Sequence, residues 1–498
     1  MGKPIERIAI VGGGTAGWIA ASVLARRLKG ACKIELIESA EIATVGVGEA
    51  TIPPILDLLT FLGIDEADFI KATQASIKLG VKFKDWREHG HSYWHPFGGF
   101  GAVIDRRPFY HYLQRARAEG LSYRVPDFSL AATLGDAGKV LFPRAGEQGA
   151  AASLRYALHF DASLVARYLR AYAERSGVVR HERTIRGASL RADGGVAALT
   201  LEGGDELRAD LYLDCSGFRG LLIEGALKTG YQDWTRWLPC DRAVAAPTQY
   251  KEDPAPYTLS TALGAGWRWR IPLQHRAGNG YVYSSAHISD DQARTDLLRD
   301  VGEEPLAEPR VLRFVTGRRN LFWNKNCVAL GLASGFLEPL ESTSIQFIIN
   351  GVYNLIDHFP DQDFDPANIA SYNTQLIDEF ETVRDFIVLH YCTTRRSDTP
   401  FWRDCAAMAA PDALRARIDL YRGTGRIFVK PVDLFTDLSW FFVLDGMGVT
   451  PQAHDPLADI ADFGAVRGAL ERLAAEVRTT AAAGLGHSEV LNAILRAP

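Results

Sequence analysis

A glycine-rich turn near the N-terminus is the feature that most constrains the fold of this chain. The stretch "RIAIVGGGTAGWIAASVLARRLKGACKIELIES" begins with an apolar run that includes Ile8, Ile10 and Val11. Small and apolar residues then follow at helical spacing from Ala16 to Leu28, and "KIELIE" is a second short apolar run. Strand, helix and strand in this order predict a βαβ unit, and therefore an α/β fold class.

The glycines of the turn predict a nucleotide site. Gly12, Gly14 and Gly17 have the spacing G-x-G-x-x-G, and Glu38 closes the second predicted strand. Such glycines allow a tight turn and a close approach of the backbone to a pyrophosphate at the helix N-terminus, and the acid can accept hydrogen bonds from ribose hydroxyls. Because a carboxylate at that place disfavours a 2′-phosphate, the pattern predicts FAD or NAD rather than NADP.

The rest of the chain favours FAD over NAD. A later predicted strand leads into Asp214 and Gly217 within "DLYLDCSGFRG", and residues 328–347 contain another strand, glycine loop and helix start. FAD-dependent oxygenases build their flavin site from three such separated segments. We find no second G-x-G-x-x-G in the sequence that would hold NAD(P)H in a Rossmann domain of its own.

Patterning along the chain alternates between helical and strand-like stretches. A second glycine loop, "VGVGEATIPP" at 45–54, precedes residues 55–80, which we predict to be helical. Residues 178–213 and 240–290 have the alternation and turn residues of short strands, and the chain beyond about residue 350 is predicted to be mainly helical.

Composition excludes several classes of function. The 498 residues carry a net charge of −5, which favours neither a nucleic-acid partner nor a membrane surface. No apolar run reaches the roughly 18 residues of a membrane span. The chain enters a predicted strand at once, so we expect no signal peptide and a soluble cytoplasmic protein.

The cysteines and histidines predict neither disulfides nor a metal site. Six cysteines lie apart without C-x-x-C spacing, as expected for buried free thiols in a reducing compartment. His89, His91 and His95 lack the helical i, i+4 pairing with an acid that favours zinc.

Four motifs together make the chain resemble the flavin-dependent tryptophan halogenases over nearly its whole length. They are the Gly12–Gly17 turn, "GVGEATIPP" at 46–54, Trp267-x-Trp269-x-Ile271-Pro272, and "FLEPLEST" at 336–343. The resemblance implies a Rossmann-like FAD-binding module of the GR2 flavin monooxygenase type, an interleaved β-sheet and helical substrate module, and a helical C-terminal part. It assigns residues 1–90, 150–235 and 315–395 to the flavin module and residues 91–149, 236–314 and 396–498 to the substrate module.

The resemblance also implies the reaction. Such enzymes take reduced FAD (FADH2) from a separate flavin reductase and use O2 with bromide or chloride to form hypohalous acid, which halogenates an electron-rich, indole-type aromatic ring. Lys78 would position or carry the halogen, and Glu341 would hold Lys78 and accept the proton that the ring loses. From the residues alone, Lys78 also fits a solvated lysine on a helix face, and Glu341 fits an acid near a helix N-terminus.

The remaining site residues come from the same resemblance. The backbone amides of Thr343 and Ser344 would bind halide, and Ser344 stands where relatives usually have glycine. The substrate would contact Pro53, His95, Phe97 and Trp440, and the alternating Trp267 and Trp269 would share one strand face beside the flavin. The implied flavin contacts are Gly12, Gly14, Thr15, Ala16, Gly17, Glu38, Val47, Gly48, Glu49, Ala50, Ile185, Leu332 and Ile345.

One stretch departs from the pattern of enzymes that halogenate free tryptophan. Those enzymes carry tyrosines, an acid and a Phe-Trp pair that hold the amino-acid backbone, and "RIFVKPVDLFTDLSWFF" at 426–442 lacks that set. We therefore expect a more open site for indole, a phenol or a larger indole-containing molecule.

Two other readings stay open at this point. A single-component FAD-dependent aromatic hydroxylase would oxidise NAD(P)H directly. A non-enzymatic flavin protein would sense redox state without turnover.

Overall fold

The computed structural model describes residues 2–39, 48–144, 146–250 and 252–496. The chain divides into two compact units, each made of three segments. Unit 1 comprises Met1–Ala75, Phe160–Asp241 and Arg313–Glu381, and unit 2 comprises Ser76–His159, Arg242–Leu312 and Thr382–Pro498. The boundaries between the two units fall at different residues from the boundaries of the predicted modules. The functional assignment of each module stays a prediction.

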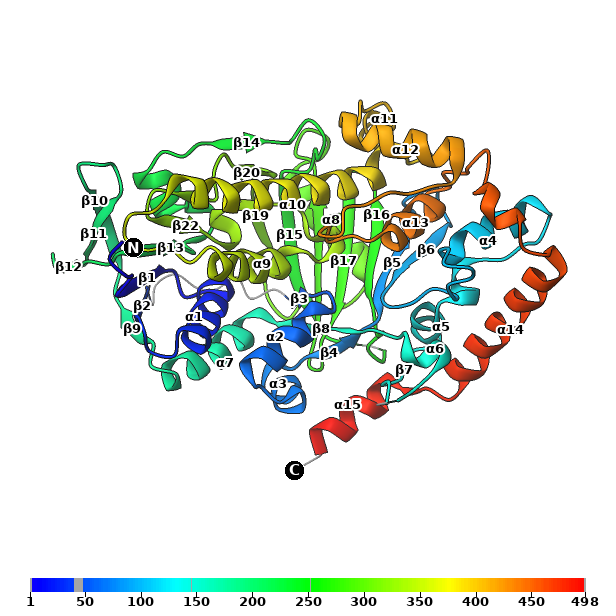
Figure 1. The fold of residues 1–498 in the computed structure, drawn as a ribbon, viewed down its shortest axis with the longest axis horizontal. Helices are drawn as coiled ribbons and strands as arrows, with labels where there is room; N and C mark the ends of the chain where they lie inside the picture. The colour runs from blue at the N-terminus through cyan, green and yellow to red at the C-terminus, as the bar shows by residue number, and fades with distance from the viewer. Residues whose placement is uncertain (1, 40–47, 145, 251, 497–498) are drawn as a thin grey trace. The chain divides into compact units, whose positions relative to one another are not determined.

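Unit 1 is built on a six-stranded sheet with the order β21-β22-β13-β1-β2-β9 (Figure 1). Its strands from β22 to β9 are parallel, and only the β21–β22 pair is antiparallel. These strands are β1 (Arg7–Val11), β2 (Lys33–Glu38), β9 (Val179–Glu182), β13 (Leu211–Asp214), β21 (Trp323–Asn324) and β22 (Cys327–Ala329). Helix α1 (Thr15–Leu28) connects β1 to β2, which confirms the predicted βαβ unit and the α/β class.

Other elements of unit 1 cover or extend this sheet. Helix α1 packs against α7 and α9, and the strands β10, β11 and β12 form a small antiparallel sheet. Strands β14, β20 and β23 form another. Their bounds are β3 (Gly48–Ala50), α2 (Pro54–Leu62), α3 (Glu66–Thr73), α7 (Ala162–Arg175), β10 (Ile185–Leu190), β11 (Val196–Leu201), β12 (Glu206–Leu207), β14 (Tyr231–Asp233), β20 (Gly317–Arg319), β23 (Gly335–Phe336), α9 (Ser344–Asp357) and α10 (Pro366–Cys392), the last of which continues into unit 2.

Unit 2 is built on a seven-stranded sheet with the order β19-β15-β18-β17-β16-β5-β6. Its pairs are antiparallel except for β16 with β5, which run parallel. The strands are β5 (Gly80–Lys84), β6 (Ser92–Pro96), β15 (Arg242–Thr248), β16 (Thr258–Leu263), β17 (Gly266–Pro272), β18 (Ala277–Tyr283) and β19 (Arg310–Arg313). Strands were predicted for residues 240–290, and this sheet confirms them.

Smaller pairs and helices complete unit 2. Strand β4 pairs with β8, and β7 pairs with β24. The chain beyond residue 350 is mainly helical, as predicted. The bounds are β4 (Ser76–Lys78), α4 (Phe109–Ala118), α5 (Leu130–Asp136), β7 (Lys139–Val140), α6 (Gly149–Ala152), β8 (Ala157–Asp161), α8 (Asp290–Val301), α11 (Pro400–Ala406), α12 (Asp412–Thr424), α13 (Asp437–Gly446), α14 (Phe463–Ala482), β24 (Leu485–Gly486) and α15 (His487–Arg496).

The predicted helix over residues 55–80 is wrong in its last third. Helix α3 stops where Gln74 adopts a left-handed conformation with φ of 53°. The next residues form β4, in which Lys78 pairs with Ala157. A left-handed residue ends the helical hydrogen bonding. The conformation of the next residues then depends on a strand partner that is distant in the sequence. Local periodicity contains no information about that partner.

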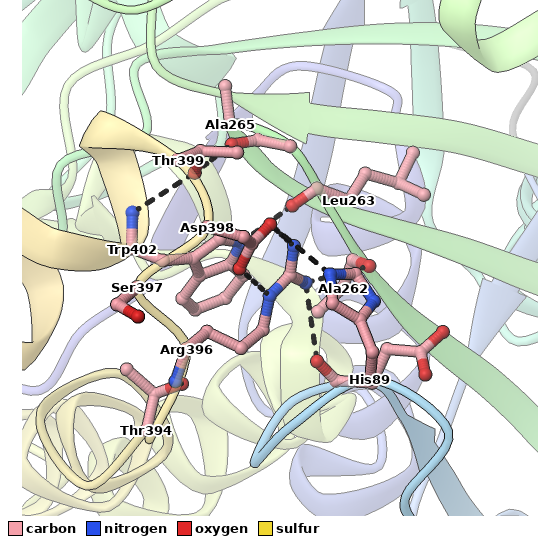
Figure 2. A network of polar contacts seen from close by, with 12 residues as sticks. His89, Ala262, Leu263, Ala265, Thr394, Arg396, Ser397, Asp398, Thr399 and Trp402 are labelled. Carbon is pink, nitrogen blue, oxygen red and sulfur yellow. Dashed lines mark hydrogen bonds and ion pairs between the residues drawn. The ribbon is translucent and has the colours of Figure 1, made fainter.

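A polar network in unit 2 fixes the segment that follows α10 (Figure 2). The Arg396 guanidinium forms hydrogen bonds to both carboxylate oxygens of Asp398, at 2.9 and 2.8 Å, and to the backbone carbonyls of Asp85 and Ala262. His89 Nε2 lies 3.2 Å from Asp398 Oδ2. Hydrogen bonding to Arg396 lowers the pKa of Asp398, so this carboxylate stays ionised and holds the segment against the β16–β17 turn.

All six cysteines are free thiols, and five of them are buried, as predicted. No helix in the described part of the chain is both long and apolar enough to cross a membrane.

Candidate active site

The glycine turn of unit 1 leaves room for a ligand at the start of α1. Gly12 has a φ of 111°, and a Cβ at this position would lie 2.4 Å from the carbonyl oxygen of Cys215, so only glycine fits there. Gly14, the residue before α1, would meet no atom of the described residues within 4 Å if it carried a Cβ. Within the described chain, no atom therefore covers Gly14 at the helix N-terminus, where the first amides, which include those of Thr15 and Ala16, lack intrahelical acceptors.

The structure brings the three separated glycine segments of unit 1 together. The amide of Cys215 donates to the carbonyl of Val11 at 2.8 Å, and the amide of Leu330 donates to that of Asp214 at 2.9 Å. A Cβ on Gly331 would lie 2.8 Å from the Cβ of Ala16. This is the arrangement expected for a flavin site that is built from three pieces of chain.

Glu38 lies against the glycine turn. A Cβ on Gly13 would collide with the Glu38 carboxylate, which places that carboxylate over the turn. Arg180 forms an ion pair with Glu38, and Arg170 Nη1 lies 4.0 Å from its Oε1. A carboxylate fixed at the end of β2 has the place and the acceptor chemistry that ribose hydroxyls need, so the residues present fit FAD.

The other residues predicted to contact the flavin are spread over unit 1. Gly48, Glu49 and Ala50 form β3, and Val47 lies outside the described residues. Burial raises the pKa of Glu49 to about 7. Ile185 begins β10 and packs on the apolar core of unit 1, Leu332 lies in the turn after β22, Ile345 is buried in α9, and Gly17 packs against the carbonyl of Gly12.

The predicted halide site lies at the beginning of α9. Thr343 precedes the helix and Ser344 is its first residue, as expected. Thr343 is buried, and its hydroxyl oxygen has no hydrogen-bond partner within the described chain. Intrahelical acceptors are not available to amides at the first positions of a helix, so a polar ligand can be held here.

Backbone strain at this corner lies at Ser342 rather than at Ser344. Ser342 adopts a φ of 62°, whereas Ser344 has an ordinary helical conformation. A side chain at position 344 therefore costs no backbone strain, and the amide is retained. Glu341 lies just ahead, at the end of a short turn over Pro339–Glu341, and is only 2% exposed.

Lys78 is fully buried in unit 2, with 0% of its surface exposed. The reading of Lys78 as a solvated lysine is therefore wrong, and so is its predicted place on a helix. Its ammonium nitrogen lies 5.0 Å from the centroid of the Phe97 ring. The amide of Phe97 donates to the carbonyl of Leu79 at 2.8 Å, which fixes the ring beside the lysine.

His95 and Trp440, two of the predicted substrate residues, belong to one aromatic cluster of unit 2. The Phe386 ring lies 5.6 Å from His95 and 4.9 Å from Trp440 between centroids. The Arg417 guanidinium lies 4.0 Å from the Trp440 ring, which is 0% exposed. Lys78, Phe97, His95 and Trp440 thus share unit 2, while Glu341 and Pro53, the residue before α2, belong to unit 1.

Trp267 and Trp269 share a buried face of β17, as their alternation predicted. Their ring centroids are 6.2 Å apart, and Trp267 also packs against Trp86 at 6.2 Å. A place beside the flavin stays a prediction for both rings.

Sequence reasoning missed two further groups of residues near the predicted site. Phe386, Phe435 and Phe442 surround His95, and only the run "SWFF" gave a partial signal for them. Ser76 lies on the strand of Lys78 and is linked through His159 to Thr258. They lie far apart in the sequence, and no motif spacing connects them.

Comparison with known proteins gives a consistent result. The family model described as tryptophan halogenase matches residues 7–462. The tryptophan 7-halogenase RebH of Lentzea aerocolonigenes is 35% identical, and the match covers 92% of each chain. Among solved structures, the flavin-dependent halogenase BrvH of Brevundimonas sp. BAL3 has 44% identity and a TM-score of 0.94, over 98% of this chain and 99% of BrvH. Xcc4156, a flavin-dependent halogenase of Xanthomonas campestris, has 44% identity and a TM-score of 0.96, over 100% of this chain and 99% of Xcc4156.

Proposed function

The chain belongs to the tryptophan halogenase family, and we propose that it uses a buried lysine to direct halogen from hypohalous acid onto an electron-rich, indole-type ring. The enzyme depends on FADH2, O2 and a halide. The observation that carries the proposal is the fully buried ammonium of Lys78 beside the Phe97 ring. A charge buried next to an aromatic wall is costly unless partners or a function compensate for it.

Unit 1 supplies the flavin and halide sites in this proposal. Gly14 and the first amides of α1 would hold the pyrophosphate, and Glu38 would accept from the ribose. When bound, reduced FAD supplies the electrons with which O2 and halide yield hypohalous acid. The amides of Thr343 and Ser344 would hold the halide, and the buried hydroxyl of Thr343 adds a further polar atom there.

Unit 2 supplies the lysine that directs the halogen. The Lys78 ammonium would donate a hydrogen bond to the oxygen of hypohalous acid, or its neutral amine would carry the halogen as a haloamine. As the carbon–halogen bond forms, the oxygen–halogen or nitrogen–halogen bond breaks. Glu341 would accept the proton that the ring carbon loses, which restores aromaticity.

His95 and Phe97 would form the aromatic wall that orients the substrate. Stacking on such rings contributes about 0.5–1.5 kcal/mol beyond burial. We also propose that Trp440 and Pro53 contact the substrate.

The charged groups of residues 426–442 support a substrate other than free tryptophan. Arg426 donates to Asp455 at 2.9 Å, and Asp433 accepts from the backbone amide of Lys430 at 3.0 Å. Burial raises the pKa of Asp437 above its ordinary value. We therefore propose an open site for indole, a phenol or a larger indole-containing molecule.

A separate flavin reductase would deliver the reduced cofactor, and we place the enzyme in the cytoplasm, where its six free thiols stay reduced. Unit 1 would act as the flavin module and unit 2 as the substrate module.

The test uses purified enzyme with FAD, a flavin reductase, NADH and bromide or chloride, and a panel of indoles and phenols. Mass spectrometry should detect halogenated products that require the reductase and the halide. NADH should stay largely unoxidised when the reductase is left out. Rapid NADH oxidation without a reductase, with hydroxylated products, would instead indicate a single-component hydroxylase.

A further inference from the structure

The strand that carries Lys78 is held by a chain of buried hydrogen bonds. In β4, Ser76 pairs with His159 of β8, and all three residues of the strand are buried. The Ser76 hydroxyl donates a short hydrogen bond to the carbonyl of Pro272. Ser76 Oγ also lies 3.2 Å from Nδ1 of His159, and His159 Nε2 lies 2.9 Å from Oγ1 of Thr258.

The proton positions in this chain follow from the donors available. Because the Ser76 hydroxyl donates to Pro272, its oxygen must accept from His159, and the proton therefore sits on Nδ1. The other ring nitrogen, Nε2, then accepts from the Thr258 hydroxyl. Burial, together with the nearby Lys78 ammonium, lowers the pKa of His159 well below its usual range, so the ring stays neutral and keeps this tautomer.

Three more hydrogen bonds hold the residues around the same strand. The amide of Ile77 donates to Nε2 of His487 at 3.1 Å, and Nδ1 of His487 donates to the carbonyl of Pro254 at 2.7 Å. The amide of Leu79 donates to the carbonyl of Pro256 at 2.8 Å. The residues on both sides of Lys78 are thus tied to the segment that leads into Thr258.

We propose that Ser76, His159 and Thr258 are positioning residues, which fix β4 and with it the Lys78 ammonium against the strand of the Trp-x-Trp-x-Ile-Pro motif. Pro272, the last residue of that motif, is the anchor through its carbonyl. This inference rests on the proposed role of Lys78. It gives the motif a function within unit 2: the carbonyl of Pro272 fixes where the lysine stands.

The reason for such a frame is the reactivity of hypohalous acid. An oxidant that is not held at one place diffuses away or attacks other side chains. A displacement of about 1 Å at a reacting group can lower a rate by about 100-fold. Two hydrogen bonds to a neutral ring, together with the bond from Ser76 to Pro272, hold the strand without adding a second charge beside the lysine.

The variant Thr258→Val tests the frame, because it removes the hydroxyl at nearly constant volume. Thr258→Ser retains the hydroxyl. Thr261→Val is the matched control on the same strand, since the buried Thr261 hydroxyl has no hydrogen-bond partner among the described residues. Ser76→Ala is a second test, with Ser129→Ala as its control, because Ser129 is equally buried and only caps α5.

Two measurements separate positioning from a general loss of stability. The first is hydrogen–deuterium exchange of a peptide that contains residues 76–79, in the protein without flavin. The second is the ratio of halogenated indole to released hypohalous acid, trapped with a diffusible phenol. Thr258→Val and Ser76→Ala should exchange faster and lower the ratio about tenfold or more. Thr258→Ser, Thr261→Val and Ser129→Ala should keep the wild-type ratio.

The outcomes are distinguishable. Wild-type exchange or a wild-type ratio in both Thr258→Val and Ser76→Ala overturns the positioning role, even if total activity falls with stability. A wild-type enzyme that yields no halogenated product overturns the proposed function instead. The exchange data would still decide whether the hydroxyls fix β4.

Discussion

At the residue scale, the candidate site includes two charged residues that are buried. Lys78 is 0% exposed and Glu341 is 2% exposed. Transfer of an ion from water to the protein interior costs several kcal/mol, and chains keep such ions mostly where partners or function compensate. Neither burial was visible in the sequence, where Lys78 stands near Lys71, Lys82 and Lys84.

Replacement of Lys78 by methionine should abolish halogenation and leave flavin binding intact. Methionine has a similar length and suits a buried site, so the fold should survive, but it has no group to direct the halogen. Product formation, measured by mass spectrometry, should fall by about 1,000-fold or more, as for the loss of an essential catalytic group. FAD affinity, measured by fluorescence quenching, should match the wild type, because Lys78 lies outside unit 1. Lys84→Met is the matched control on an exposed position. Sustained halogenation by Lys78→Met would contradict the role of this lysine.

Glu341→Gln should slow halogenation without stopping formation of the oxidant. The amide retains the shape of the side chain but cannot take the ring proton, and general base catalysis contributes about 100- to 10,000-fold. Trapping with a diffusible phenol should therefore show more released hypohalous acid per halogenated product than in the wild type. An equal loss of product and of trapped oxidant would assign Glu341 to halide or flavin binding instead.

At the element scale, the packing of α9 on α10 places an acid in an apolar setting. The Asn350 side chain on α9 donates to Glu379 on α10 at 2.5 Å. Nearby, the rings of Phe347 and Phe380 stack at 3.9 Å. Burial raises the pKa of Glu379 to about 7 from an ordinary value of 4.5. Helix α9 begins at the predicted halide site, so its seating also affects that site.

The raised pKa of Glu379 predicts a pH-dependent stability. The folded state favours the protonated acid, so this contribution is present below about pH 4.5 and is lost as the pH rises through about 7. One pKa unit corresponds to about 1.4 kcal/mol, and the wild type should lose about 1–3 kcal/mol of unfolding free energy between pH 5 and 8 from this group. Glu379→Gln carries no such charge. Its advantage over the wild type in urea unfolding should therefore grow with pH, and a constant difference would rule out this cause.

At the scale of the whole molecule, the chain combines a mainly parallel sheet in unit 1 with a mainly antiparallel sheet in unit 2. The parallel sheet gathers its glycine turns at the carboxyl ends of the strands, where nucleotides bind in such folds. The antiparallel sheet includes the paired strands β5 and β6. Strand β6 carries His95 and ends just before Phe97, and β5 begins two residues after Lys78. The proposed chemistry thus divides between an oxidant-forming unit and a substrate-holding unit.

The substrate preference of the whole enzyme should favour indole over free tryptophan. Arg426 and Asp433, two of the charged side chains of residues 426–442, are engaged within unit 2, so we expect the amine and carboxylate of tryptophan to gain little from them. We expect kcat/KM for indole to equal or exceed that for tryptophan, in reactions with reductase and bromide followed by chromatography. A strong preference for free tryptophan would show that a backbone clamp exists elsewhere.

The sequence by itself determined the elements whose signals are local. The turn at Gly12, Gly14 and Gly17, the βαβ unit and the beginning of α9 at Ser344 all follow from spacing and turn chemistry, and the structure confirms them. Glycine positions can be interpreted from the sequence because few other residues tolerate the backbone conformations that glycine adopts or the close contacts that it permits.

Only the tertiary structure decided what surrounds those elements. Lys78 became a buried strand residue because Ala157, 79 positions later, supplies its β partner. The frame of Ser76, His159 and Thr258 joins residues far apart in the sequence, and Phe386 joins His95 to Trp440. Pairing and burial depend on chain segments that no local window contains, and this is why sequence periodicity misplaced the lysine.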